Sequence, residues 1–324
     1  MREAAFIEQN KEKWLEIEKS IKNKNIIDPE ILANYYIELT NDLAYAQTFY
    51  PKSKIEEYLN LLTSSAHQSI YTDKRNSKNQ IIWFFKEHIP LTIYESRKYI
   101  LYSFLIFFIS ILIGLVSSKH DNADFVRLIL GDSYVNTTIN NIANGDPAAI
   151  YASGGALGSS IAITINNIKV AFFAFALGIF LSVGTAYILF HNGVLLGAFH
   201  YLFVRYDVLG EAMTAIWIHG TIEIAMIILA GACGIQMGNS ILFPKSYKRI
   251  DSFKFQTKKA GTILVSTIPF FIIAGFLEGY VSRHYMTSIY LSLAIILLSI
   301  LLLTFYYIYL PLKIAKKQNE KTNI

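Results

Sequence analysis

The chain has few charged residues and almost no cysteine. Of its 324 residues, 16% are Asp, Glu, Lys or Arg, whereas a typical soluble domain has about 25%. Its one cysteine, Cys233, lies in an apolar segment and cannot form an intrachain disulfide. The first 30 residues contain no apolar stretch of the kind found in a cleavable signal peptide. These shortages exclude a disulfide-stabilised scaffold, and we expect insertion into a membrane through internal segments.

Apolar residues make up 53% of the sequence, and they occur in long blocks. Residues 99–117 and 287–312 contain no charged side chain. An uncharged apolar run of about 18 residues or more is typical of a membrane-spanning helix. The sequence therefore predicts an all-α, polytopic membrane protein. It excludes a soluble enzyme or a DNA-binding domain, and we expect membrane lipids, not nucleic acid, as partners.

Residues 1–72 are expected to form a cytoplasmic domain of amphipathic helices. Apolar side chains recur at seven-residue spacing, for example Trp14 and Ile21, which places them on one helix face. Ser53 and Glu56 have the spacing of a capping box and predict the start of a third helix. A bundle this small is marginally stable alone, so we expect its apolar stripe to contact the membrane domain or a second copy.

Residues 73–98 are expected to connect this domain to the membrane. A polar linker comes first, and a segment that mixes aromatic and charged residues follows it. This segment is too charged to cross a bilayer and is typical of an interfacial elbow helix. We expect Trp83 and Tyr94 to lie at headgroup level and Pro90 to bend the chain.

A transmembrane domain is predicted at 99–312. Strong candidates for spans are 99–118, 169–190, 212–236, 260–281 and 286–311, and 193–209 is a weaker one because it contains Arg205 and Asp207. If 193–209 crosses the membrane there are about six spans, with the third one short or unwound. If it is re-entrant there are five.

The positions of basic residues predict the orientation. The 237–259 loop and the tail at 313–324 are rich in lysine, whereas the 119–168 segment has four Asp against one Lys and one Arg. The positive-inside rule places the first two in the cytoplasm and 119–168 outside. Six spans satisfy all these assignments, with both termini cytoplasmic.

Ionisable residues inside predicted spans are costly to bury and mark candidate functional positions. His219 and Glu223 are four residues apart and share a helix face. Glu278 lies near the outer end of its span, with Arg283 after it. We expect these four residues to form a polar cluster within the membrane.

Four roles for this cluster remain open. It can hold a divalent metal with Glu278 as third ligand, relay protons, form a structural hydrogen-bond network, or bind a ligand or partner directly. The sequence has no H-E-x-x-H motif, so we assign no metal, cofactor or catalytic residue and expect no enzymatic activity.

Small and amide residues at span positions have simpler explanations. Gly220, Gly275 and Gly279 are expected to allow close helix packing. Asn166 and Asn167 are expected to cap a span that begins just after them.

Several stretches of the chain resemble the stage II sporulation protein M family of bacterial membrane proteins, also called domain of unknown function 95. The most distinctive are HGTIEI at 219–224 and LEGYVSR at 277–283. Others are REAAFIEQNKEKWLEIE at 2–18, LAYAQTFYP at 43–51, GDPAAIY at 145–151, INNIKVAFFAFALGI at 165–179 and LFHNGVLLGAF at 189–199. The resemblance makes His219, Gly220, Glu223 and Glu278 the expected signature positions.

The resemblance implies a scaffold-like membrane subunit, because the founding sporulation member works in a complex with a peptidoglycan hydrolase and a second membrane protein. We therefore expect a non-enzymatic inner-membrane subunit that self-associates, most simply as a homodimer, and binds cell-envelope proteins. The alternative is a transporter or channel for a small or amphiphilic solute that uses the intramembrane His/Glu cluster.

Overall fold

The computed structural model describes residues 2–22, 29–71, 77–121, 124–149 and 155–322. Of the described residues, 91% are helical and none lies in a strand. The all-α fold predicted from the sequence is confirmed. The chain divides into two compact units, Met1–Gln80 and Ile81–Ile324.

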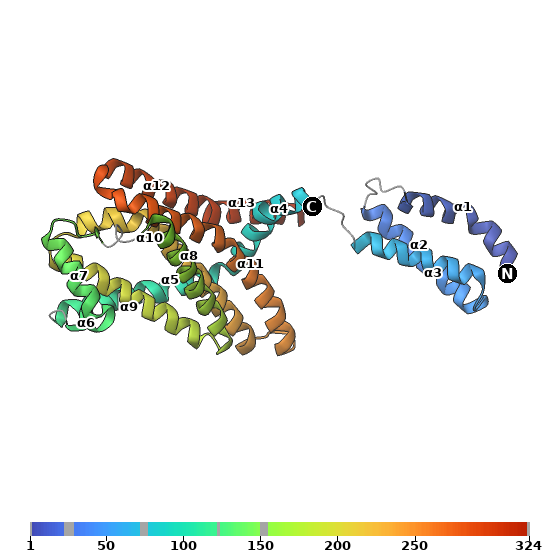
Figure 1. Ribbon diagram of the computed structural model, residues 1–324. Coiled ribbons are helices and arrows are strands. Elements are labelled where there is room, and N and C mark those ends of the chain that lie inside the picture. The colour runs from blue at the N-terminus through green and yellow to red at the C-terminus, as the bar shows by residue number, and fades with distance from the viewer. Residues whose placement is uncertain (1, 23–28, 72–76, 122–123, 150–154, 323–324) are drawn as a thin grey trace. The chain divides into compact units, whose positions relative to one another are not determined.

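The N-terminal unit is a bundle of three helices, α1 (Glu3–Lys22), α2 (Pro29–Phe49) and α3 (Lys54–Tyr71) (Figure 1). Its core contains Trp14, Ile17, Leu39 and Leu59, all with at most 2% of their surface exposed. The Trp14 indole donates a hydrogen bond to Asp42 Oδ2 at 2.8 Å. The apolar stripe of α1 is therefore buried against α2 and α3.

Among the described residues, six helices are long and apolar enough to cross a membrane, which confirms the predicted number of spans. They are Gln80–His120, Ala156–Ile179, Val183–Arg205, Leu209–Leu242, Arg249–Val281 and Ile289–Gln318. Their main α-helical parts are α5 (Ile89–His120), α8 (Ala156–Ala176), α9 (Val183–Arg205), α10 (Leu209–Leu242), α11 (Arg249–Phe276) and α12 (Ile289–Thr304) (Figure 1). The last span continues through a π-helical turn (Phe305–Tyr309) into α13 (Leu310–Thr322).

The predicted limits of the second and third spans are wrong. α8 begins at Ala156, not at 169, and the chain reverses at 180–182. Leu181 and Ser182 make this turn with φ angles of 55° and 70°, which non-glycine residues rarely adopt. The third span is a regular helix, α9, and is neither short nor unwound.

The outer segment is correspondingly shorter than predicted. Much of 156–168 belongs to α8, so Asn166 and Asn167 lie inside a helix and do not cap one. Between α5 and α8 the chain forms two short helices, α6 (Asp124–Leu130) and α7 (Asp132–Ala143). The basic loop predicted at 237–259 is also shorter than expected. Residues 237–242 and 249–259 are helical, and the connection between the helices is 243–248.

The expected elbow is also continuous with the first span. α4 (Ser77–Trp83), a π-helical turn (Phe84–His88) and α5 follow one another without a break. Pro90 lies in the first turn of α5, just after the π-helical turn. A proline is tolerated there because the wider turn releases the backbone bond that its ring would block.

α10 is the central helix of the membrane unit, and it contacts α5, α8, α9, α11 and α12. Two of its neighbours, α5 and α9, approach each other closely at glycines. A Cβ atom on Gly193 of α9 would lie 2.7 Å from Phe107 O on α5, and one on Gly197 would lie 2.8 Å from Leu115 N. Small residues in the spans therefore serve helix packing within the chain.

Candidate intramembrane site

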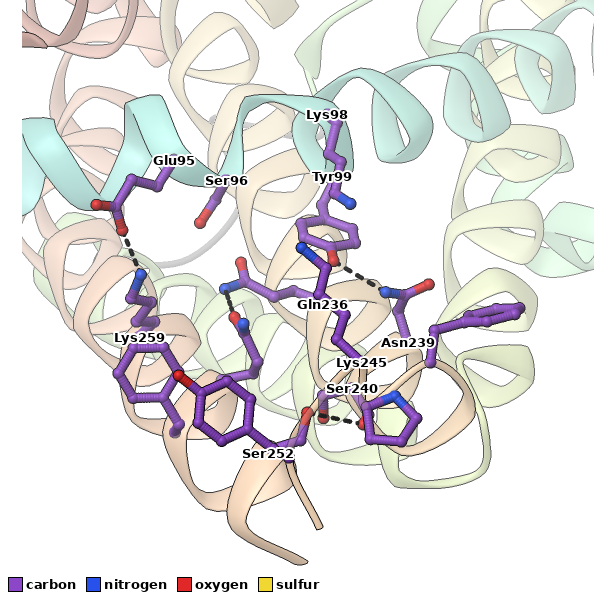
Figure 2. Close-up of a pocket in the computed structure, with 15 residues that line it drawn as sticks. Glu95, Ser96, Lys98, Tyr99, Gln236, Asn239, Ser240, Lys245, Ser252 and Lys259 are labelled. Atoms are coloured by element: carbon purple, nitrogen blue, oxygen red, sulfur yellow. Dashed lines mark hydrogen bonds and ion pairs between the residues drawn. The ribbon is translucent and has the colours of Figure 1, made fainter. Parts of the chain in front are cut away.

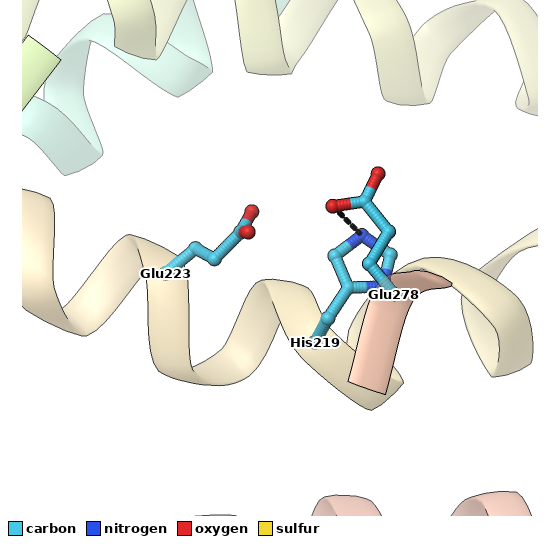
Figure 3. Close-up of side chains that lie close together, drawn as sticks. All are labelled: His219, Glu223 and Glu278. Carbon is cyan, nitrogen blue, oxygen red and sulfur yellow. Dashed lines mark ion pairs between the residues drawn. The ribbon is translucent and has the colours of Figure 1, made fainter. Parts of the chain in front are cut away.

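Two elements bring the predicted ionisable residues together. His219 and Glu223 project from one face of α10, a helical turn apart. Glu278 comes from the π-helical turn (Leu277–Val281) that ends α11. Such turns widen a helix locally and often occur at functional sites. Figure 3 shows the carboxylate of Glu278 lying next to the imidazole of His219.

The three side chains are close enough to share one small ligand. His219 Nε2 and Glu278 Oε2 are 3.8 Å apart. One ligand atom from each of His219, Glu223 and Glu278 lies within 4.8 Å of the other two. His219 and Glu278 are buried, with 4% and 9% of their surface exposed. Two carboxylates at this spacing inside a membrane favour uptake of a positive charge, either a proton or a cation.

Neighbouring side chains orient two members of this cluster. Asn167 Nδ2 of α8 donates a hydrogen bond to Glu223 Oε1 at 2.5 Å. On the other side, the Ser282 hydroxyl lies 2.9 Å from His219 Nδ1. This second contact leaves the Nε2 atom of His219 facing Glu278. No Lys or Arg forms an ion pair with either carboxylate within the described ranges.

A cavity of about 370 Å³ adjoins the cluster, and His219, Gly220 and Glu223 form part of its wall. The rest is mainly apolar: it is lined by Ile129, Leu130, Tyr134, Leu195, Leu196, Phe199, Ile216 and Ile224. These residues come from α6, α7, α9 and α10, so the short outer helices cover the cavity.

Tyrosines in and near the outer segment supply further polar contacts. Tyr134 lines the cavity, and burial raises its pKa to about 12, so its hydroxyl stays protonated at neutral pH. The Tyr285 hydroxyl donates to Asp146 Oδ1 at 2.8 Å, which joins the outer segment to the turn after α11. Burial is also the main cause of the raised pKa of Tyr285.

The remaining predicted residues divide into three groups. Gly275 and Gly279 lie against α8, where added Cβ atoms would come within 2.9 Å of Ser160 O and 2.6 Å of Ala156 O. Gly220 is different, because it faces the cavity and not a neighbouring helix. The Arg283 side chain lies outside the described part of the structure.

Sequence reasoning missed Asn167, Ser282 and Tyr134. Asn167 was recognisable in principle, since an amide in the middle of an apolar helix is as unusual as a carboxylate there. It was overlooked because the second span was expected to begin after it. Ser282 lies in the distinctive LEGYVSR stretch but carries no charge to mark it, and Tyr134 has no local signal; the tertiary fold brings both to the site.

The fold and the cluster define a polytopic α-helical membrane protein with a polar site between its spans. A family model described as Stage II sporulation protein M matches residues 103–283, more than half of the chain. The protein belongs to this family. A second model, described as Domain of unknown function (DUF8413), matches residues 4–72 in the N-terminal unit. No curated protein and no solved structure matches the chain.

Proposed function

We propose that the protein is a transporter or channel for a small amphiphilic solute. One observation carries the proposal: His219 and Glu223 form the polar part of the wall of an otherwise apolar cavity of about 370 Å³. A solute with an apolar body and a positively charged end matches both parts of that wall. The carboxylate of Glu223 would receive the charged end, and Leu196 and Phe199 would contact the body.

The electrostatics of the cluster support a cation over an anion. Glu223 and Glu278 lie close together. In the described part of the chain Glu223 is bonded by the Asn167 amide and Glu278 lies beside the His219 imidazole, and neither carboxylate pairs with a Lys or Arg. A solute cation would supply the positive charge that this arrangement lacks. The π-helical turn that holds Glu278 gives α11 a point at which it can bend during passage.

Uptake by reconstituted vesicles tests this proposal, with ethidium as a fluorescent amphiphilic cation. We expect the wild-type protein to take it up faster than protein-free vesicles do. Glu223→Gln should slow uptake by about tenfold or more, because it removes the charge that binds the cation. Glu211→Gln is the matched control, since Glu211 is an exposed residue on the same helix, and should change uptake by less than about twofold.

Two outcomes contradict the proposal. One is uptake no faster than in protein-free vesicles. The other is aggregation of Glu223→Gln in detergent, which would favour a structural network. Calorimetry with Zn²⁺ covers the metal alternative, because the three ligand atoms within 4.8 Å also suit a divalent ion. Tight, Glu223-dependent Zn²⁺ binding without uptake would favour a metal centre, and with it a hydrolase.

A scaffold role in a cell-envelope complex and self-association stay predictions. Two features had suggested them, the apolar stripe of the N-terminal helices and the small residues of the spans. Both features make contacts within the chain. The apolar stripe is buried at Trp14 and Ile17 in the N-terminal unit, and Gly193 and Gly197 pack against a neighbouring helix in the membrane unit. Location in a bacterial inner membrane with cytoplasmic termini is likewise proposed from the distribution of lysines.

A further inference from the structure

A second pocket lies where α5, α10 and α11 meet around the 243–248 connection (Figure 2). Its volume is about 430 Å³. Three lysines, Lys98, Lys245 and Lys259, line it together with one acidic residue, Glu95. The pocket therefore carries an excess of positive charge.

Among the described residues, one of these lysines forms an ion pair: Lys259 with Glu95. Lys98 and Lys245 form no ion pair in the part of the chain that is described, and in Figure 2 they extend into the pocket from opposite walls. Lys98 Nζ lies 4.7 Å from the centroid of the Tyr99 ring, a contact that supplies no counter-ion. Two ammonium groups without a carboxylate partner among the described residues favour an anion between them.

Buried polar groups at the same place also lack partners. Ser96 is 1% exposed, and its hydroxyl has no hydrogen-bond partner among the described residues. Gln236 is 2% exposed; its Nε2 donates to Gln256 at 2.8 Å, while its Oε1 has no partner in the same part of the chain. Exchanging the O and N positions of both amides keeps this contact and leaves an N–H of Gln236 unpaired. Unsatisfied buried groups of this kind are rare without a ligand or water.

The Tyr99 hydroxyl adds a donor. It accepts a hydrogen bond from Asn239 Nδ2 at 2.9 Å, so its own hydrogen is available to an acceptor in the pocket. Tyr99 is 8% exposed, and this contact with α10 holds its ring in place. Donors thus approach the same space from two helices and a connecting segment.

We propose that this pocket binds a phosphate group. A phosphate offers several acceptor oxygens in different directions, which suits separated ammonium and hydroxyl donors better than a single planar carboxylate does. The pocket lies at the ends of α10 and α11, beside a basic connection. That position lets the phosphate come from an anionic lipid headgroup or from a soluble phosphate ester.

Binding to the purified full-length protein distinguishes these two sources. The probes are phosphatidylglycerol, glycerol 3-phosphate and, as a lipid without phosphate, diacylglycerol. We expect phosphatidylglycerol to bind and diacylglycerol not to. Competition by glycerol 3-phosphate would assign the site to soluble esters as well as lipids, and its absence would assign the site to lipids alone; either result supports a phosphate site.

Variants show whether this pocket is responsible. The double variant Lys98→Gln, Lys245→Gln should weaken binding of phosphatidylglycerol by about tenfold or more. Lys254→Gln, Lys258→Gln is the matched control, because it removes the same charge from exposed positions of α11 outside the pocket, and it should weaken binding by less than about twofold. Equal loss in both doubles would indicate a diffuse basic surface and overturn the proposal.

Ser96→Ala separates binding from folding. The hydroxyl has no partner among the residues that the structure describes, so its removal should leave the unfolding temperature unchanged or raised. Binding should still weaken by about threefold. Unchanged binding in this variant, or equal binding of diacylglycerol and phosphatidylglycerol, would contradict the assignment.

Discussion

At the scale of single residues, the contact that defines the site is the hydrogen bond from Asn167 to Glu223. A carboxylate between membrane helices is costly unless its oxygens are bonded, and this amide bonds one of them at 2.5 Å. Asn166, the adjacent residue, is exposed and takes no part. Two neighbouring asparagines therefore have opposite roles, and this difference permits a matched test.

Asn167→Leu should destabilise the protein by about 1–3 kcal/mol, because it leaves an oxygen of Glu223 buried without its donor. Asn166→Leu should leave the free energy of unfolding nearly unchanged or raise it, since it places an apolar side chain on the exposed face of α8. Thermal unfolding in detergent measures both changes.

A double-mutant cycle checks the mechanism. In the Glu223→Gln background the cost of Asn167→Leu should differ by about 0.5–3 kcal/mol from its cost in the wild type. Additive effects, or equal costs for Asn166→Leu and Asn167→Leu, would show that the hydrogen bond is unimportant.

At the scale of the elements, the close approach of α8 to the end of α11 holds Glu278 near α10. Gly279 lies in the same π-helical turn as Glu278 and packs against Ala156 and Ser160 at the start of α8. A side chain at Gly279 would displace this turn. Glycine at position 279 thus allows the close contact with α8 that holds the Glu278 carboxylate in place.

Gly279→Ala should destabilise the protein by about 1–3 kcal/mol, because its Cβ would come within 2.6 Å of Ala156 O. Gly261→Ala on α11 is the control: no atom lies within 4 Å of its Cβ position, so it should be neutral or stabilise by up to about 1 kcal/mol. Unfolding temperatures of the two variants give the comparison. A neutral Gly279→Ala would mean that the α8 contact tolerates an added methyl group.

The helices and the cluster were largely predictable from local sequence, but one turn between helices was not. Six spans were predictable, because runs such as 287–312 exceed the length that a bilayer needs. His219, Glu223 and Glu278 were recognisable because charge is rare inside such runs. The α8–α9 turn was not, since Leu181 and Ser182 adopt left-handed angles without glycine or proline and packing against α10 enforces them, as the Ser182 bond to Ile235 O at 3.0 Å indicates.

At the scale of the whole membrane unit, the two candidate sites lie toward opposite ends of α10. His219 and Glu223 face the cavity beneath α6 and α7, and Gln236 and Asn239 face the basic pocket. Over 17 residues an α-helix rises about 25 Å, which is most of the thickness of a bilayer core. One buried helix therefore contributes to a carboxylate cluster and, several turns further along, to a lysine-rich pocket.

This separation makes the orientation of the protein testable with two cysteines. In a Cys233→Ala background, Ser133→Cys on α7 should react with a membrane-impermeant maleimide in intact cells. Lys254→Cys on α11 should react only after lysis, because an odd number of spans separates the two exposed positions and lysine-rich segments remain in the cytoplasm. If only Lys254→Cys is labelled in intact cells, the orientation is the reverse of the one predicted. If both cysteines are labelled, the six-span arrangement is contradicted. The expected pattern places the amphiphile cavity toward the outer surface and the phosphate pocket at the cytoplasmic leaflet, where anionic headgroups and soluble phosphate esters can both reach it.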